Sequence, residues 1–171
     1  MNEKVAIVTG GSGGIGSAIC KAFVNSGSSV SVADLDMSAA KTTAKKISEG
    51  TTNTIATHVD VTNEFSVESA INQVIKHFGR VDYLVHCAGN NIKAPILNMS
   101  LSQWKSSLDI NLTGAFLLSK AVATQMVKQG EGGRIVFISS VAGITPVPER
   151  GSYGPAKAGM INLAGMLSLE W

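Results

Sequence analysis

The stretch from Lys4 to Gly16, KVAIVTGGSGGIG, joins a short apolar run to a glycine-rich loop. The run up to Thr9 is rich in Val and Ile, and such short runs form strands that are buried on both faces of a parallel sheet. The loop leads into a helical pattern with apolar residues at Ile15, Ile19 and Phe23. A strand, a loop and a helix in this order predict the first part of a βαβ unit.

Strand-like and helical segments alternate along the rest of the chain. We expect further strands at residues 29–33, 54–59, 81–86 and 134–139. We expect further helices at residues 38–48, 64–78, 102–129 and 152–171, the third starting at a capping box of Ser100 and Gln103 and interrupted near Asp109. Five strands alternating with helices predict an α/β fold. Residues 1–171 should form a single Rossmann-like domain, a doubly wound parallel sheet with helices on both faces.

Composition excludes several classes of protein. Hydrophobic residues make up 44% and charged residues 15% of the 171 residues, which indicates a folded globular chain. The formal net charge is +2 and the basic residues are dispersed, so we expect no nucleic-acid partner. No apolar run is long enough to span a bilayer and no cleavable leader is apparent, so we expect a cytoplasmic protein without membrane contact. Cys20 and Cys87 have no metal-ligand spacing and are interpreted as reduced packing residues.

The loop from Gly10 to Gly16 has the position and composition of a phosphate-binding loop. Glycines let the backbone approach a pyrophosphate, and the positive end of the following helix stabilises its charge. No Gly-Lys-Ser/Thr sequence follows, which excludes a P-loop. A glycine-rich turn without a ligand remains the alternative.

Asp34 ends the expected second strand, where a carboxylate can bind an adenosine ribose and repel a 2'-phosphate. It therefore favours NAD over NADP. A surface turn or a helix cap, a role for which Asp36 is the rival, is the alternative.

A second group of residues has the chemistry of proton transfer. Tyr153 and Lys157 lie one turn apart on an expected helix, where the ammonium group favours the phenolate form of the tyrosine. Ser140 follows the expected fifth strand, and its hydroxyl can orient a substrate oxygen. A nucleophilic serine is not expected, because no GxSxG sequence surrounds Ser140. A helix start with Pro155 in its first turn is the structural alternative for the YGPAK sequence.

Thr9-Gly10-x-x-x-Gly14-x-Gly16 and Tyr153-x-x-x-Lys157 together resemble the motifs of the short-chain dehydrogenase/reductase family. The resemblance spans the whole chain and implies an NAD(P)-dependent oxidoreductase that interconverts a secondary alcohol and a ketone, with Tyr153 as the acid or base. The catalytic residues it implies are Asn111, Ser140, Tyr153 and Lys157. The cofactor-binding residues it implies are Gly10, Ser12, Gly13, Gly14, Ile15, Gly16, Asp34, Leu35, Asp60, Val61, Ala88, Gly89, Tyr153 and Lys157. Members that prefer NADP often carry a basic residue at the place of Gly13, so NAD is again favoured.

His86 and Cys87 stand where the family has two asparagines. We interpret both as packing residues and expect no metal site there, because neighbours on a strand point to opposite faces.

Family members continue past the helix that starts near Ser152, so the resemblance implies a domain that lacks the last strands. The substrate stays open, with sugars or polyols, 3-oxoacyl thioesters and simple ketones as candidates. A catalytically idle cofactor-binding or interaction module is the alternative function. The resemblance also implies a homo-oligomer, formed through the two helices at Ser102–Gln129 and Ser152–Trp171.

Overall fold

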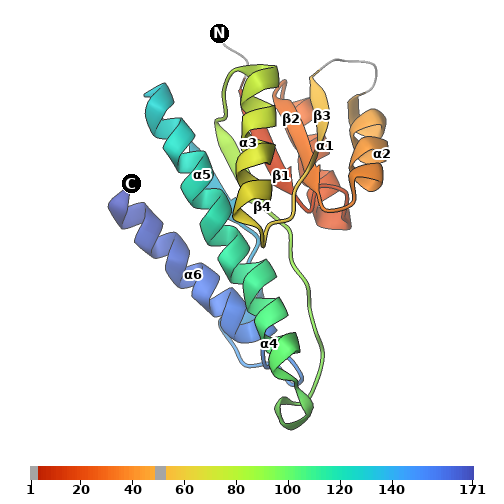
Figure 1. The fold of residues 1–171 in the computed structure, drawn as a ribbon, viewed down its shortest axis with the longest axis vertical. Coiled ribbons are helices and arrows are strands. Elements are labelled where there is room, and N and C mark those ends of the chain that lie inside the picture. Colours follow the sequence, from red (N-terminus) through yellow and green to blue (C-terminus); the bar gives the residue numbers. More distant parts are fainter. Residues whose placement is uncertain (1–3, 49–52) are drawn as a thin grey trace.

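A five-stranded parallel sheet forms the centre of the molecule (Figure 1). A computed structural model describes residues 4–48 and 53–171. The strand order is β3-β2-β1-β4-β5, and the predicted doubly wound parallel sheet is confirmed. The strands are β1 (Val5–Thr9), β2 (Ser29–Asp34), β3 (Thr54–His58), β4 (Tyr83–His86) and β5 (Arg134–Phe137).

Strand β1 lies in the middle of the sheet, and all five of its residues are buried. Thr9, its last residue, lies opposite Ala33 of β2 on one side and His86 of β4 on the other. The carboxyl ends of these three strands therefore meet at one edge of the sheet, and the loops that follow them lie close together.

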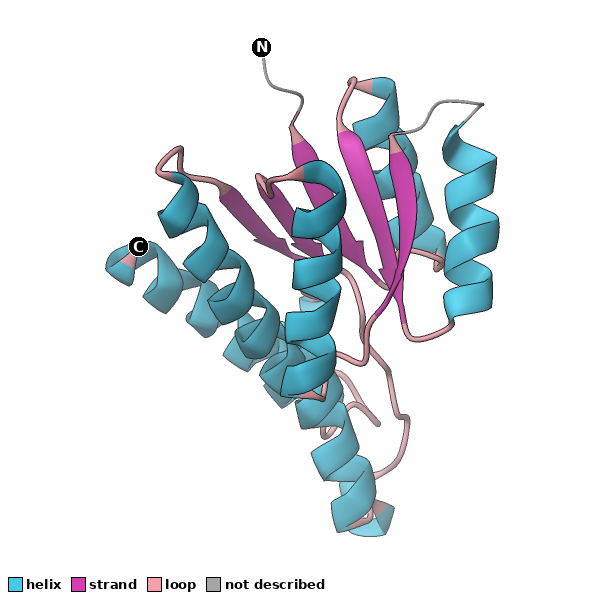
Figure 2. Cartoon of the chain, turned by 45° about the horizontal axis from the view of Figure 1, so that its top comes forward, coloured by secondary structure: helices cyan, strands magenta, loops and turns pink. Residues whose placement is uncertain are grey.

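The helices cover both faces of the sheet. Their bounds are α1 (Gly14–Asn25), α2 (Met37–Ser48), α3 (Glu64–Phe78), α4 (Leu101–Leu108), α5 (Gly114–Gln129) and α6 (Tyr153–Glu170). One apolar cluster joins α1 and α2 to the sheet, and the other joins α3 and α5 to its opposite face. Helices α5 and α6 lie side by side on the side of the molecule away from α2 (Figures 1 and 2).

The expected interruption near Asp109 is a short π-helical segment, η2 (Asp109–Thr113), between α4 and α5. Before it, Ser100 and Gln103 form the predicted capping box at the start of α4, with each side chain accepting a hydrogen bond from the other's backbone. Thus α4, η2 and α5 form one continuous path with a single widened turn. Such turns are often found at functional sites.

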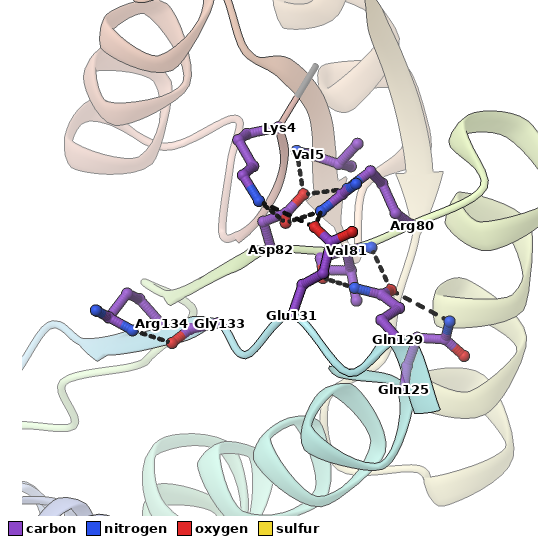
Figure 3. A network of polar contacts seen from close by, with 10 residues as sticks. All are labelled: Lys4, Val5, Arg80, Val81, Asp82, Gln125, Gln129, Glu131, Gly133 and Arg134. Atoms are coloured by element: carbon purple, nitrogen blue, oxygen red, sulfur yellow. Dashed lines mark hydrogen bonds and ion pairs between the residues drawn. The ribbon is translucent and has the colours of Figure 1, made fainter. Parts of the chain in front are cut away.

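Strands β4 and β5 are each two residues shorter than their sequence patterns predict. β4 begins at Tyr83 rather than Val81, although the backbone of the preceding Asp82 still pairs with Val5 and Arg134. The Asp82 side chain is held by Lys4, the Val5 backbone and Arg80 (Figure 3). β5 ends at Phe137 rather than Ser139. The chain after β5 turns so that the Ser139 hydroxyl donates to the Lys157 carbonyl of α6.

None of the helices within residues 4–48 and 53–171 combines the length and apolar character that crossing a membrane requires.

Candidate functional site

The glycine loop is folded tightly against the loop after β4. Gly10 has a φ of +62°, which side chains disfavour, and a Cβ there would lie 2.9 Å from the Ala88 backbone nitrogen. A Cβ at Gly16 would overlap the Gly10 carbonyl oxygen. Glycine at these two positions therefore lets the loop pack closely against the loop after β4 and against the buried Gly16 of α1. The first N–H groups of that helix have no partners within the helix and form a positive end suited to an anion.

Asp34 is oriented by the glycine loop. Its Oδ2 accepts hydrogen bonds from the Ser12 backbone nitrogen at 3.0 Å and from the Ser12 hydroxyl at 2.5 Å. Asp36, not Asp34, caps α2, because its Oδ1 accepts from the backbone nitrogens of Ser38 and Ala39. Asp34 is thus joined to the predicted phosphate-binding loop and is not the cap of a helix.

A cavity of about 900 Å³ lies at the carboxyl edge of the sheet. It is lined by these predicted cofactor-binding residues: Gly10, Ser12, Gly13, Asp34, Leu35, Asp60, Val61, Ala88 and Gly89. Gly14 and Ile15 are exposed at the start of α1, and Gly16 is buried beneath the loop, so these three do not line it.

Sequence reasoning missed the opposite wall of this cavity, which belongs to α4 and the start of η2. The lining residues there are Ser102, Lys105, Ser106, Asp109 and Ile110. Ser102, Lys105, Ser106 and Asp109 have the spacing of one helix face. That periodicity is the signal that could have revealed them, but it does not say what the face contacts.

Asp60 is engaged within its own turn. Its Oδ1 accepts from the Thr62 hydroxyl at 2.7 Å and from the Thr62 backbone nitrogen at 2.9 Å. The hydroxyl hydrogen bond, followed by the backbone one, lowers the pKa of Asp60. The carboxylate thus faces the cavity as an anion that is already hydrogen-bonded, and its contact with an adenine stays a prediction.

Asn111 is the third residue of η2 and is completely buried. Its Nδ2 donates to the Ser107 carbonyl at 2.9 Å and to the Asn90 side-chain oxygen at 2.9 Å. Its Oδ1 has no hydrogen-bond partner in the part of the chain that the structure describes. A Cβ at Gly89 would lie 2.6 Å from that oxygen and 3.6 Å from Lys157 Nζ. The Asn111 oxygen and the Lys157 ammonium group therefore approach the same point above Gly89.

Lys157 is almost fully buried on the first turns of α6. Its Nζ donates to the Ile138 carbonyl at 2.9 Å and lies 5.6 Å from the centre of the Tyr153 ring. Burial lowers the pKa of Lys157, and the nearby Cys87 opposes this shift weakly. The structure thus brings the predicted Tyr153 and Lys157 together, with the amine fixed beneath the ring.

Ser140 lies between β5 and α6. Its Oγ accepts from the Ala142 backbone nitrogen at 3.2 Å and caps the short 3-10 helix η3 (Val141–Gly143). Close packing joins this helix to α6, because a Cβ at Gly143 would lie 2.8 Å from the Lys157 carbonyl carbon. Ser140 is therefore carried on a segment that rests directly against the helix of Tyr153 and Lys157.

His86 does more than pack. It is fully buried, and its Nδ1 is 2.9 Å from the Thr9 hydroxyl, so it links the central strands β1 and β4. The interpretation of His86 as a packing residue was therefore incomplete. Cys87 is half-buried and lines the cavity.

Comparisons with known proteins agree with this geometry. A D-threitol dehydrogenase of Mycolicibacterium smegmatis is 35% identical over 171 residues, which are 100% of this chain and 65% of that protein. A 3-oxoacyl-[acyl-carrier-protein] reductase of Synechocystis is 38% identical, over 99% of this chain and 69% of its own. The crystal structure of an NAD+-bound xylitol dehydrogenase superposes with a TM-score of 0.94 at 32% identity, covering 99% of this chain and 65% of that one.

This chain thus spans about two thirds of the length of such relatives. The family described as short chain dehydrogenase matches residues 4–171. Both the family's extent along the chain and the likeness of the folds lead to one conclusion: the chain belongs to the short chain dehydrogenase family.

Proposed function

We propose that the protein is an NAD-dependent oxidoreductase that interconverts a secondary alcohol and a ketone. The observation that carries this proposal is the position of Gly89. It lines the 900 Å³ cavity, and a Cβ at its place would approach both Asn111 Oδ1 and Lys157 Nζ. The cavity and the acid-base residues therefore share one wall, as a hydride transfer coupled to a proton transfer requires.

The residues present fit a dinucleotide. The glycine loop leaves the start of α1 open to a pyrophosphate, and Asp34 lines the same cavity as a hydrogen-bond acceptor. When bound, NAD would supply the acceptor for the hydride that leaves the carbinol carbon. The other changes of the reaction are proton movements, and they fall to side chains of this protein.

Tyr153 is proposed to take the hydroxyl proton of the alcohol during oxidation and to return it during reduction. The Lys157 ammonium group, fixed by the Ile138 carbonyl beside the ring, favours the phenolate that accepts this proton. Ser140 would hold the substrate oxygen through its hydroxyl. Asn111 offers a buried oxygen without a partner among the described residues, which suits it to a water that passes protons to Lys157.

NAD is proposed as the preferred cofactor. Asp34 is held at the cavity by two hydrogen bonds from Ser12, and a 2'-phosphate there would meet a fixed negative charge. Gly13 adds no positive charge to offset it. The NAD+ in the related xylitol dehydrogenase supports the same choice.

Polyols are the substrate class that we propose first, with 3-oxoacyl thioesters second. Threitol and xylitol dehydrogenases are among the relatives, and so is a 3-oxoacyl reductase. We also propose a homo-oligomer through α5 and α6, whose outer faces expose Phe116, Val127, Ile161 and Met166.

Substitution of Tyr153 by Phe tests the proposal, because it removes one oxygen atom. Turnover is measured with a panel of polyols and NAD, and with a 3-oxoacyl thioester and NADH. We expect a loss of about 10²-fold or more in kcat, the usual contribution of a general acid-base group, with unchanged NADH binding measured by fluorescence.

Tyr83→Phe is the matched control. Tyr83 lies at the start of β4, away from the cavity, and its ring stacks on Phe23 at 5.4 Å. Removing its hydroxyl group should therefore leave kcat unchanged. If Tyr153→Phe kept the turnover of the unmodified chain, Tyr153 would not be the acid-base group.

A further inference from the structure

Asn90 follows Gly89 directly and contacts Asn111 through two oxygen atoms. It is half-buried and lines the cavity from the loop that follows β4. Asn111 Nδ2 lies 3.0 Å from the Asn90 carbonyl oxygen and 2.9 Å from Asn90 Oδ1. Two oxygens of one residue therefore meet a single nitrogen of the buried asparagine.

Backbone carbonyls fix the orientation of the Asn111 amide. One polar atom of this amide lies 2.9 Å from the Ser107 carbonyl oxygen and 3.0 Å from the Asn90 carbonyl oxygen. A carbonyl oxygen can only accept a hydrogen bond, so this polar atom is the nitrogen. The Asn111 oxygen is then the atom near the place of a Gly89 Cβ, where Lys157 Nζ also approaches.

The orientation of the Asn90 amide follows from that of Asn111. An amide nitrogen cannot accept, so the Asn90 side-chain atom 2.9 Å from Asn111 Nδ2 is the oxygen. The Asn90 nitrogen then faces α4, where Ser106 Oγ lies 3.4 Å away, beyond the usual distance of a hydrogen bond. The short contact of the Asn90 side chain is therefore the one with Asn111.

Three oxygens surround the two hydrogens of Asn111 Nδ2. The Ser107 carbonyl, one helical turn before Asn111, accepts one hydrogen. The carbonyl and side-chain oxygens of Asn90 share the other in a three-centre hydrogen bond. If the amide were turned over, the Asn111 oxygen would face three other oxygens, and its NH₂ group would lie on the side of the Lys157 ammonium group.

We propose that the Asn90 side chain is a positioning residue, which holds the Asn111 amide with its oxygen towards Gly89 and Lys157. Asn90 Oδ1 adds a third acceptor to the two backbone carbonyls and makes the opposite orientation of the amide less favourable. Asn90 would thus act on turnover through Asn111, not through the reacting atoms. The catalytic part of this inference rests on the proposed function, whereas the hydrogen bond does not.

The hydrogen bond is tested by NMR of the ¹⁵N-labelled chain without substrate. The side-chain amide of Asn111 is identified by the absence of its signals in Asn111→Ala. We expect its hydrogen exchange to be about fivefold faster in Asn90→Leu, which has nearly the shape of asparagine but no acceptor. Asn90→Asp keeps an oxygen at the same place and should restore slow exchange. Unchanged exchange in Asn90→Leu would overturn the proposal.

Kinetics separate positioning from a general effect of the loop. We expect Asn90→Leu to lower kcat about fivefold, with NADH binding changed by less than about twofold. Asn90→Asp should restore most of kcat, and its added charge should appear in the KM for NAD. Equal losses of kcat in the two variants would refute a role for the Asn90 acceptor.

Asn91→Leu is the matched control. The neighbouring Asn91 is exposed and does not line the cavity, so this variant should keep the kcat of the unmodified chain. A loss as large as that of Asn90→Leu would show that any apolar residue in this loop lowers kcat, and would refute positioning by Asn90.

The dependence on Asn111 is tested with a double variant. In an Asn111→Ala background, Asn90→Leu should lower kcat no further, because the residue through which Asn90 acts is gone. A full additional loss would refute positioning through Asn111. If the unmodified chain shows no turnover at all, the proposed function fails, and the exchange measurement still decides whether Asn90 holds Asn111.

Discussion

Asp82 is the centre of a polar network at the amino ends of β1 and β4 (Figure 3). Its side chain is only 3% exposed and accepts hydrogen bonds from Lys4 Nζ at 2.9 Å, the Val5 backbone nitrogen at 2.9 Å and Arg80 Nη2 at 2.6 Å. Arg80 also reaches Glu131, just before β5. We therefore expect Asp82→Asn to weaken the attachment of three strands at the end of the sheet opposite the cavity.

The pKa of Asp82 sets the size of the effect. Burial alone would raise this pKa, but the hydrogen bonds from Arg80, Lys4 and Val5 outweigh burial and lower it from 3.8 to about 2. At about 1.4 kcal/mol per pKa unit, this shift corresponds to about 2.5 kcal/mol. Solvent reaches Lys4 and Glu131 and screens their charges, so we expect a contribution of about 1 to 2 kcal/mol to the free energy of unfolding.

The direction of the pH dependence follows from the lowered pKa. Because the folded state binds the Asp82 proton more weakly than the unfolded state, the stabilisation is fully present above about pH 4 and is lost as the pH falls through about 2. Urea unfolding followed by circular dichroism should show the full difference between Asp82→Asn and the unmodified chain at pH 7. The difference should shrink between pH 4 and pH 2.

Glu64→Gln is the matched control, since Glu64 forms a 3.2 Å ion pair with Lys120 in which both side chains are more than half exposed. It should leave the free energy of unfolding at pH 7 nearly unchanged. An Asp82→Asn variant as stable as the unmodified chain at pH 7, or a difference that persists undiminished at pH 2, would refute the role assigned to the Asp82 carboxylate.

Three further predictions concern the site and the assembly. Asp34→Arg should shift the kcat/KM ratio for NAD over NADP towards NADP by about tenfold or more, and unchanged discrimination would contradict the assignment. Gly89→Ala should lower kcat at least about tenfold, because its Cβ would lie 2.6 Å from Asn111 Oδ1, whereas Gly165→Ala, where a Cβ meets nothing within 4 Å, should be harmless to turnover. Phe116→Glu should shift an oligomer towards monomers in sedimentation velocity, and an unchanged sedimentation coefficient would exclude α5 from the interface.

The fold could be predicted where local sequence decides the structure. Helix α3 has the expected bounds, because Asn63 caps its first turn and Gly79 ends it with a φ of +79°. The bounds of β4 could not be predicted in this way. Val81 is apolar and precedes β4 in one strand-like run, and the Asp82 backbone still pairs with Val5 and Arg134, while the Asp82 carboxylate is held by Lys4, which is far away in the chain. The end of a strand in such a case depends on long-range contacts that periodicity does not reveal.

The candidate site likewise has one part that local sequence predicts and another part that depends on long-range contacts. The positions of Gly10 and Asp34 at the cavity, and of Tyr153 beside Lys157, could be predicted because each follows from a local strand end, loop or helix spacing. Their roles stay predictions. The wall formed by Lys105 and its neighbours on α4 could not be predicted, because a polar helix face looks the same in sequence whether it meets solvent or a cavity. The link from His86 to Thr9 likewise joins two strands that are 77 residues apart in the chain.

The position of the site follows from the strand order. The chain leaves β1 through α1, which packs on one face of the sheet, and it leaves β4 on a path to α5, which packs on the other face. Adjacent parallel strands whose connections diverge to opposite faces open a crevice at their carboxyl ends. Gly10 and Gly89 follow β1 and β4 at that crevice, and a Cβ at either would strike the neighbouring structure, at Ala88 or at Asn111. The topology therefore opens the cavity between β1 and β4, and glycine at these two positions keeps it joined to the residues that we propose for acid-base chemistry.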